Sequence, residues 1–283
     1  MIQISQLLPA IRVHSWGGFG SQLFTAYVIL KIQTRYPGRR VKAIIHTSGV
    51  TRRATEFRFD KLGVTAKQIE DYKSEEVKSK ANRNHHNSLA AFKKYLINIL
   101  QCLRFIQNAN TDSSFNSTRF WTISFRGHYT RLTLDESTVR LLYYVLFPVK
   151  SEMLKRNDNF VIHYRLGDLL DLSGKTPVSI ERIESICNES ITHLVTPILM
   201  SDSNKEELTN FLARSNFLKS FELLNANPIA TLETCVMAHS FLGTGAKISL
   251  WAAIFRYFLF GKESFLPEEL IWAQQNGVKA VWY

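Results

Sequence analysis

The chain has 283 residues, of which 45% are hydrophobic and 21% are charged, and this composition excludes a disordered chain. The length fits two small domains better than one ordinary domain. No stretch approaches the roughly 20 uninterrupted apolar residues that cross a bilayer, because Ile248–Phe260 is too short and includes Arg256.

The start of the chain and its cysteines favour a cytoplasmic location. Met1 to Gly20 contain no long apolar run behind a basic start, so we expect no signal peptide. The three cysteines stand far apart without a CxxC spacing, which fits a reducing compartment and argues against a structural zinc site. We expect a cytoplasmic protein, with the cytoplasmic face of the membrane as a peripheral location.

The net charge of +11 is unevenly distributed. Residues 1–150 hold 23 Lys and Arg against 9 Asp and Glu, whereas residues 151–283 hold 12 against 15. This asymmetry predicts an anionic partner for the first half. Nucleic acid, an anionic membrane surface and a diphosphate-bearing lipid all qualify, and a basic surface kept for solubility is the alternative.

Predicted strands and helices alternate along the first half, which is typical of α/β layers. Ile11–Ser15 is a predicted strand, Trp16–Ser21 a glycine-rich turn, and Gln22 to about Arg35 a helix that Pro37-Gly38 ends. Further elements predicted here are strands over Val41–His46 and Phe120–Phe125, a helix over Leu134–Leu146, and a helical insertion over about 71–118 with an amphipathic helix near Leu89–Phe105.

The polar segment Val149–Asn159 is the predicted boundary between a domain of residues 1–150 and one of residues 151–283. The alternation restarts after it. The predicted strands are Phe160–Tyr164, Pro197–Met200, Ser220–Leu224 and Phe241–Gly243, and the predicted helices are Ser179–Asn188, Lys205–Arg214, Thr231–Ala238, Lys247–Phe260 and Pro267–Asn276.

Three turns that follow predicted strands contain residues suited to bind phosphate. In the first, Gly18 and Gly20 let the backbone approach a ligand, and Ser21 is a candidate cap of the next helix, whose N-terminus suits an anion. The spacing is neither a dinucleotide fingerprint nor a Walker loop, so a tight turn without a ligand stays the alternative.

The second turn follows the apolar strand at residue 160. His163 and Arg165 are two residues apart and therefore point to one face at the carboxyl end of the strand, where open α/β sheets bind ligands. Arg165 can make a forked contact with phosphate oxygens, and Asp168 in the following turn can orient it. The alternative is a simple ion pair between Arg165 and Asp168 that ties a loop.

The third turn is Thr244-Gly-Ala246, before the helix that begins at Lys247. Hydroxyls at Thr244 and Ser249 can bind phosphate oxygens. Lys247 is unfavourable at a helix N-terminus, which is easier to explain if an anion binds there. Trp251 and Phe255 form a stripe that we interpret as core packing.

The order and separation of the three segments resemble the fucosyltransferase superfamily, with the bacterial α-1,2 branch nearest in pattern. The family's Gly-Gly-x-Gly-Asn-Gln reads Gly17-Gly18-Phe19-Gly20-Ser21-Gln22 here. Its His-x-Arg-x-Gly/Thr-Asp is matched in full by residues 163–168, and its Ser-Trp-Trp-Ala-Ala reads Ser249-Leu-Trp251-Ala-Ala. Weaker similarities are Gly127-His-Tyr129 and Ser201-Asp202. The resemblance spans roughly residues 11–260, without the insertion.

The resemblance implies a GT-B fold: two Rossmann-like α/β domains with a cleft between them, the first on the acceptor side and the second binding a GDP-sugar. It implies inverting transfer of a sugar, fucose by the family's activity, without a metal or another cofactor. The implied catalytic residues are Arg165, His163, Ser21 and Gln22, and the implied donor-binding residues are Gly18, Gly20, Arg165, Asp168, Asp202, Thr244, Lys247 and Ser249. Ser21 and Leu250 depart from the family's Asn and Trp.

The expected acceptor is a glycan or a lipid-linked oligosaccharide, as in surface polysaccharide synthesis, at an anionic membrane surface. Inverting transfer needs a base near the acceptor hydroxyl. The first half offers five candidates, which are His14, His46, Glu56, Asp60 and His128. Two alternatives remain: a transferase of surface glycans using another sugar nucleotide or a pyruvyl donor, and a basic nucleic-acid-binding protein, although no nucleic-acid-binding motif is present.

Overall fold

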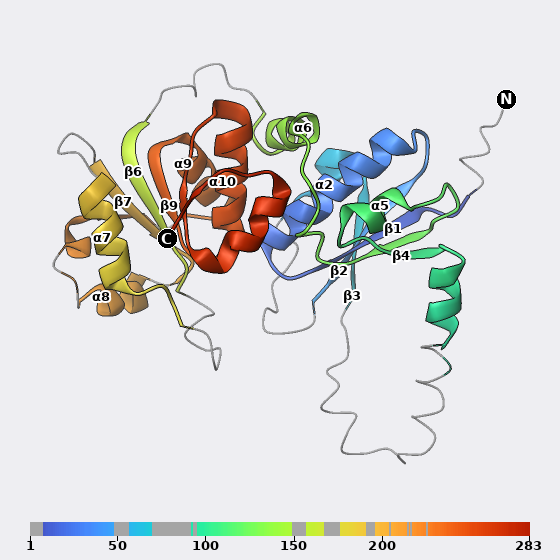
Figure 1. Cartoon of the computed structure of the whole chain (residues 1–283), viewed down its shortest axis with the longest axis horizontal. Helices are drawn as coiled ribbons and strands as arrows, with labels where there is room; N and C mark the ends of the chain where they lie inside the picture. Colours follow the sequence, from blue (N-terminus) through green and yellow to red (C-terminus); the bar gives the residue numbers. More distant parts are fainter. Residues whose placement is uncertain are drawn as a thin grey trace, which may run out of the picture. The chain divides into compact units, whose positions relative to one another are not determined.

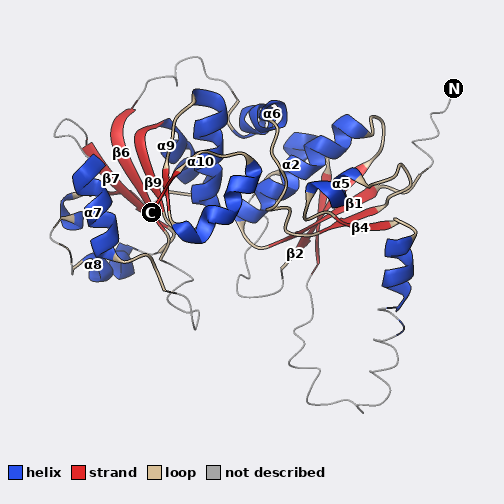
Figure 2. Cartoon of the chain, viewed as in Figure 1, coloured by secondary structure: helices blue, strands red, loops and turns tan. Residues whose placement is uncertain are grey.

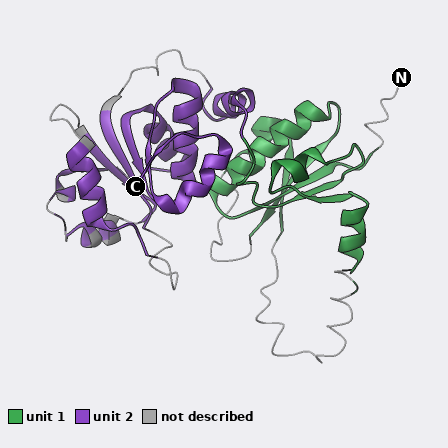
Figure 3. Cartoon of the chain, in the orientation of Figure 1, with its two compact units in different colours: residues 1–133 green, residues 134–283 purple. Residues whose placement is uncertain are grey.

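The computed structural model describes residues 8–47, 57–69, 92, 95–148, 157–166, 176–190, 196–203, 205–213, 215, 217–224 and 226–283. These residues form two compact units, 1–133 and 134–283 (Figure 3). Each unit has one sheet of parallel strands with helices beside it (Figure 2), so the predicted α/β class is confirmed. The predicted cleft between two domains stays a prediction.

The first unit contains a five-stranded parallel sheet in the order β3-β2-β1-β5-β4. Figure 1 labels its strands β1, β2, β3 and β4. The central strand β1 is buried on both faces around Val13, and the β2 residues that pair with this part of the strand are buried as well. Burial on both faces is expected for a parallel sheet. The strands are β1 (Ile11–Trp16), β2 (Val41–His46), β3 (Thr65–Ile69), β4 (Ile106–Asn108) and β5 (Ser124–Arg126).

The principal helix of the first unit is α2 (Phe19–Arg35). Its N-cap is Gly18, without a side-chain cap, so the helix begins three residues earlier than predicted and Ser21 lies in its first turn instead of capping it. Most of α2 is buried because it packs on the sheet. The other helical segments of this unit are η1 (Phe59–Leu62), α5 (Asp112–Asn116) and residues 95–102.

The second unit contains a six-stranded parallel sheet in the order β11-β10-β9-β6-β7-β8. Counted within the unit this is the doubly wound order of nucleotide-binding folds, with the first strand beside the fourth. The strands are β6 (Asn157–Tyr164), β7 (Thr196–Ser201), β8 (Glu222–Leu224), β9 (Ala238–Gly243), β10 (Phe265–Leu266) and β11 (Val281–Trp282). The helices are α6 (Glu136–Leu146), α7 (Ile180–Ser190), α8 (Lys205–Leu212), η3 (Leu218–Ser220), α9 (Pro228–Met237), α10 (Lys247–Phe260) and η4 (Glu268–Asn276).

Helix α6 belongs to the second unit, so the units divide at Thr133/Leu134 and not at residue 150, where the polar segment predicted the boundary. The reason is packing. α6 buries Val139 and Leu142 and lies against α10, and Arg140 Nη2 donates to the carbonyl oxygen of Phe258 at 3.1 Å. The polar segment lies mostly outside the described residues.

The predicted insertion is also shorter than expected, because β4 and α5 fall within residues 71–118 and β4 pairs with β5 in the sheet. Four short strands (β3, β4, β10 and β11) were not predicted, and η4 is a 3-10 helix. Within the described residues, no helix is both long enough and apolar enough to span a bilayer.

Candidate functional site

The order of the strands in the second sheet reverses between β6 and β9. The chain proceeds from β6 to β7 on one side of this pair and from β9 to β10 on the other. In such folds ligands bind in the crevice outside the carboxyl ends of the two strands. β6 ends at Tyr164 and β9 at Gly243, so Arg165 and Thr244 are the first residues beyond the two ends. Two of the three predicted turns therefore meet here.

Thr244 joins the ends of the two strands. Its side chain is 1% exposed, and its Oγ1 accepts a hydrogen bond from Arg165 N at 2.8 Å and donates to the carbonyl oxygen of His163 at 3.2 Å. Its backbone N–H also donates to that carbonyl at 3.0 Å. The hydroxyl predicted to bind phosphate is thus engaged in fixing the backbone that carries Arg165.

His163 and Ser249 form the buried floor of the site. His163 Nδ1 lies 2.7 Å from Ser249 Oγ, and the two residues are 2% and 0% exposed. Burial lowers the pKa of His163 to about 4, with the positive charge of Arg165 acting in the same direction and Asp202 opposing it. The imidazole is therefore neutral at pH 7, and it can offer a hydrogen bond but no charge.

Gly243 makes the contact between β9 and α10 possible. It pairs in register with His163 on β6. A Cβ atom at this position would lie 2.5 Å from Ser249 Cβ and 3.0 Å from Ser249 Oγ, closer than real side chains approach. Only glycine lets Ser249 reach His163, a requirement that was not predicted from the sequence, where the low-bulk turn was placed at Thr244–Ala246.

Arg165 supplies the positive charge at this edge. Its side chain is half-buried, and Nη1 donates to the carbonyl oxygen of Gly245 at 3.1 Å, which holds the guanidinium beside the turn that leads to α10. The N-cap of α10, Ala246, has no side-chain acceptor, and the first turn contains no acidic residue but does contain Lys247. A guanidinium next to a helix N-terminus without acidic residues is suited to bind an anion.

Asp202 also contributes to this edge. It follows β7, and its Oδ1 accepts a hydrogen bond from Leu166 N at 2.9 Å, so it holds the backbone just beyond Arg165. The predicted contact of Asp168 with Arg165 lies outside the described residues. The strand ends thus bring together five predicted residues, namely His163, Arg165, Asp202, Thr244 and Ser249.

The predicted residues of the first glycine turn lie in the other unit. The backbone N–H groups of Ser21 and Gln22 donate to the carbonyl oxygen of Gly18 at 2.9 and 3.1 Å. Gln22 is completely buried, and its Oε1 accepts from Phe57 N at 2.8 Å. Gly20 is a buried residue of the first helical turn. The functional roles of Gly18, Gly20, Ser21 and Gln22 stay predictions.

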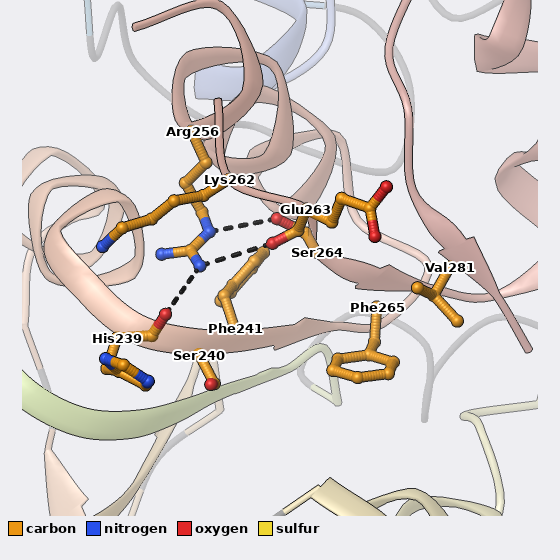
Figure 4. A pocket seen from close by; sticks show the side chains of 9 residues that line it. All are labelled: His239, Ser240, Phe241, Arg256, Lys262, Glu263, Ser264, Phe265 and Val281. Atoms are coloured by element: carbon orange, nitrogen blue, oxygen red, sulfur yellow. Dashed lines mark hydrogen bonds between the residues drawn. The ribbon is translucent and has the colours of Figure 1, made fainter. Parts of the chain in front are cut away.

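A cavity of about 240 Å³ lies at the opposite edge of the second sheet, beside the amino ends of β9 and β10 (Figure 4). Its central group is Arg256, which is 1% exposed and donates to Ser264 Oγ at 3.0 Å and to the carbonyl oxygens of Ala238 at 2.6 Å and His239 at 3.1 Å. These contacts occupy the guanidinium, so the cavity is built around a structural arginine.

The fold and the strand-end residues define an α/β protein whose doubly wound sheet has an edge suited to bind an anion. No protein-family model matches the chain, and no curated protein matches it. One similar solved structure is a glycosyl transferase family 9 protein from Veillonella parvula DSM 2008, with 7% identity, a TM-score of 0.44, and coverage of 98% of this chain and 87% of that chain. Another is a sialyltransferase from Photobacterium damsela, with 10% identity, a TM-score of 0.35, and coverage of 97% and 81%. Similarities this low carry no functional argument, so the assignment depends on the residues of the site.

Proposed function

We propose that this chain is a glycosyltransferase that takes a sugar, fucose, from GDP-fucose. The observation that carries the proposal is the convergence of Arg165, His163 and Ser249 at the switch point of a doubly wound sheet. These residues come from two segments that are 80 residues apart, and both segments match motifs of the fucosyltransferase superfamily. Because neighbouring parallel strands end at one edge, the fold itself brings the two motifs together, and the proposal is supported by the residue types that they place there.

The proposed reaction is an inverting, metal-independent transfer. The acceptor oxygen bonds to the anomeric carbon while the bond from that carbon to the diphosphate oxygen breaks, and the electron pair leaves with the diphosphate. In our proposal Arg165, Lys247 and the N-terminus of α10 stabilise this developing charge without a cation. Neutral His163, held by Ser249, donates a hydrogen bond to the donor.

One departure from the family pattern, at Leu250, lies within the third motif but says little about the donor. Leu250 stands where the family has Trp, and both Leu250 and Trp251 are 0% exposed. Trp251 packs against Phe255 with ring centroids 5.4 Å apart, which confirms the predicted core role of this stripe. The Leu250 departure is therefore a change of core packing. The other departure is Ser21 in the first motif. Because of it, a different sugar nucleotide or a pyruvyl donor stays the alternative.

We further propose that the acceptor is a glycan, most simply a lipid-linked oligosaccharide, at the cytoplasmic face of an anionic membrane. Residues 77–111 contain six Lys and Arg and no Asp or Glu. The helical residues here and Leu103 in the turn that follows them expose an apolar stripe with the spacing of one helix face. The stripe consists of Phe92, Tyr95, Leu96, Ile99 and Leu103, which are 64%, 64%, 45%, 37% and 54% exposed. An exposed apolar helix face within a segment whose sequence is rich in Lys and Arg is typical of in-plane membrane binding.

A nucleotide panel tests the proposed donor class. Thermal unfolding is followed with GDP, UDP, CMP, TDP and phosphoenolpyruvate, since a ligand that binds the native state raises the midpoint. We expect GDP to give the largest shift and Arg165→Lys to reduce it. A largest shift with another nucleotide would replace the donor, a shift only with phosphoenolpyruvate would favour pyruvyl transfer, and no shift with any of them would refute the transferase.

A further inference from the structure

The first unit has an arginine at the carboxyl edge of its parallel sheet. Arg126 is the last residue of β5 and pairs in register with Asn108, the last residue of β4. On the other side of β5, Val13 of β1 pairs with Phe125, so His14 is the neighbour of Arg126 when this register continues by one residue. Because residues paired in register share a face of the sheet, the three side chains form a row across three strands. Parallel α/β sheets bind ligands at this edge.

The charge of Arg126 is not neutralised by the part of the first unit that the structure describes. The side chain is half-buried, and its Nε is buried without a hydrogen-bond partner among the described residues. The carboxylates that the structure describes in this unit are Asp60, which binds Arg58, and Asp112, which accepts from Thr133. Buried polar groups are nearly always paired, and an unpaired buried charge is costly, so this guanidinium calls for an anion.

A second arginine of the unit shows how a structural guanidinium is satisfied here. Arg39 Nε is also buried without a partner, but its two Nη atoms donate to the carbonyl oxygens of Phe120 and Pro9. No such contact of Arg126 is found within the described residues. Arg39 thus ties segments of the fold together, whereas Arg126 keeps its donors for another group.

The turn after β5 holds two amide side chains close to Arg126. Gly127 has φ +143°, and a Cβ atom there would collide with Asn110 Oδ1 and lie 3.3 Å from Asn108 Oδ1. Asn110 Oδ1 accepts from the backbone N–H groups of His128 at 2.8 Å and Tyr129 at 3.4 Å, so Asn110 fixes the turn. Asn108 is exposed on the face that carries Arg126, and its amide can donate an N–H to a ligand oxygen there.

An aromatic ring lies at the same edge. Trp16 ends β1, two residues after His14, and is therefore on the face that carries Arg126. Its ring stacks on that of His46 with centroids 4.4 Å apart, and His46 Nε2 lies 2.8 Å from His14 Nδ1. The ring of His128 meets Trp16 edge-on at 6.2 Å, so the turn after β5 and the end of β1 are in contact. The indole is half-buried and can pack against the C–H groups of a sugar ring.

We propose that Arg126 binds the carboxylate of an acidic sugar in the acceptor, a role that rests on the proposed glycosyl transfer. A guanidinium binds a carboxylate through two parallel N–H···O bonds, and Asn108 offers a further N–H beside it. Trp16 provides the apolar surface for the ring that carries the carboxylate. The charge of this half of the chain favours such a ligand, because residues 1–150 hold 23 Lys and Arg against 9 Asp and Glu. The acceptor is thereby narrowed to a glycan that contains a sugar carboxylate.

The test follows the Nε–H signal of Arg126 in ¹⁵N spectra of the whole chain while a small ligand is added. The ligands are methyl β-glucuronide, its neutral counterpart methyl β-glucoside, and inorganic phosphate. Arg126→Gln identifies the signal by its loss. Arg12→Gln is the matched control, because Arg12 is an exposed arginine of the same sheet near the amino end of β1.

We expect the glucuronide to shift the Arg126 signal, the glucoside to leave it unchanged, and phosphate to shift it less. Arg126→Gln should weaken glucuronide binding about tenfold or more, as for the loss of hydrogen bonds to a charged group, and Arg12→Gln should bind like the wild type. A larger shift with phosphate would replace the acidic sugar by a phosphate group. A signal that none of the three ligands moves would overturn the site.

A second variant places a carboxylate of the chain itself beside the guanidinium. Asn108→Asp is nearly isosteric and lies at an exposed residue, so the fold should persist, which thermal unfolding checks. We expect it to abolish glucuronide binding, because the new carboxylate occupies Arg126 and repels the ligand. An Asn108→Asp protein that binds the glucuronide like the wild type would contradict the inference.

GDP affinity, measured by calorimetry on the same proteins, separates failure of this site from failure of the proposed function. A wild type that binds GDP while its Arg126 signal ignores the glucuronide overturns this inference alone. If the wild type does not bind GDP, the proposed function fails, and the Arg126 signal still decides whether the first unit binds a sugar carboxylate.

Discussion

Removing the hydroxyl of Thr244 should weaken the connection between the two strand ends on which the proposed donor site depends. Thr244→Val keeps the shape of the side chain but eliminates the bond from Arg165 N at 2.8 Å and the bond to His163 O at 3.2 Å. Arg165 N–H then loses its acceptor in a partly buried position. The backbone of Arg165, which carries the positive charge of the site, is then no longer held by the side chain of residue 244.

The expected magnitude follows from these two bonds. Each net hydrogen bond contributes about 1 kcal/mol, and an unsatisfied buried N–H costs a further 1–3 kcal/mol or so. Since Arg165 is only half-buried, we expect Thr244→Val to lower the free energy of unfolding by about 2–3 kcal/mol. GDP affinity should fall about tenfold, equivalent to roughly 1.4 kcal/mol.

Thr244→Ser is the matched control, because it keeps the hydroxyl and loses one buried methyl group, a cost of about 1 kcal/mol in stability. Urea unfolding gives the stability of both variants, and calorimetry gives their GDP dissociation constants. The reasoning is refuted if Thr244→Val binds GDP as tightly as Thr244→Ser does.

Three further predictions concern other parts of the molecule. Gly243→Ala should lower the free energy of unfolding in urea by about 1–3 kcal/mol, because its Cβ would lie 2.5 Å from Ser249 Cβ. Adding Ser249→Gly should recover part of that loss, and a double variant without any recovery contradicts the contact. The pKa of about 4 for His163 lies below its unfolded value near 6.5, so the unfolded state takes up the proton first and stability should fall by roughly 2 kcal/mol between pH 7 and pH 5. His163→Asn should lack this part of the pH dependence, and an identical pH profile in the variant argues against a buried neutral ring. Leu96→Asp should reduce flotation with anionic vesicles at low salt, whereas Ile271→Asp, at an equally exposed apolar residue of the other unit, should not; equal flotation of the two variants counts against the membrane surface.

The meeting of the strand-end residues could be predicted because parallel strands end at one edge. His163 and Thr244 are each recognisable at the end of an apolar run, and the parallel register then brings the two ends together without further information. The α/β class was predicted from the alternation of strands and helices along the chain. Asp202 was indicated only by the family resemblance, as part of the weaker similarity Ser201-Asp202.

The elements that sequence reasoning missed have weak local signals. β3 carries the exposed sequence TAKQI at a sheet edge, and β10 and β11 have two residues each, so none shows a hydrophobic periodicity. The unit boundary was misplaced because the packing of α6 on α10 joins segments that are far apart in the chain. The bridge between His14 and His46 depends on the register of β1 and β2, which no local pattern determines.

The most direct measurement of the central claim is the GDP dissociation constant of the wild type, of Arg165→Lys and of Arg140→Lys. Arg140 lies on α6 and donates to the carbonyl oxygen of Phe258 near the C-terminus of α10, so the same substitution there tests a cation away from the strand ends. Because the forked contact of a guanidinium with phosphate is lost in lysine, we expect Arg165→Lys to weaken GDP binding about tenfold or more. Arg140→Lys should bind GDP like the wild type. Equal affinities in all three proteins would contradict the assignment of Arg165 to the departing diphosphate.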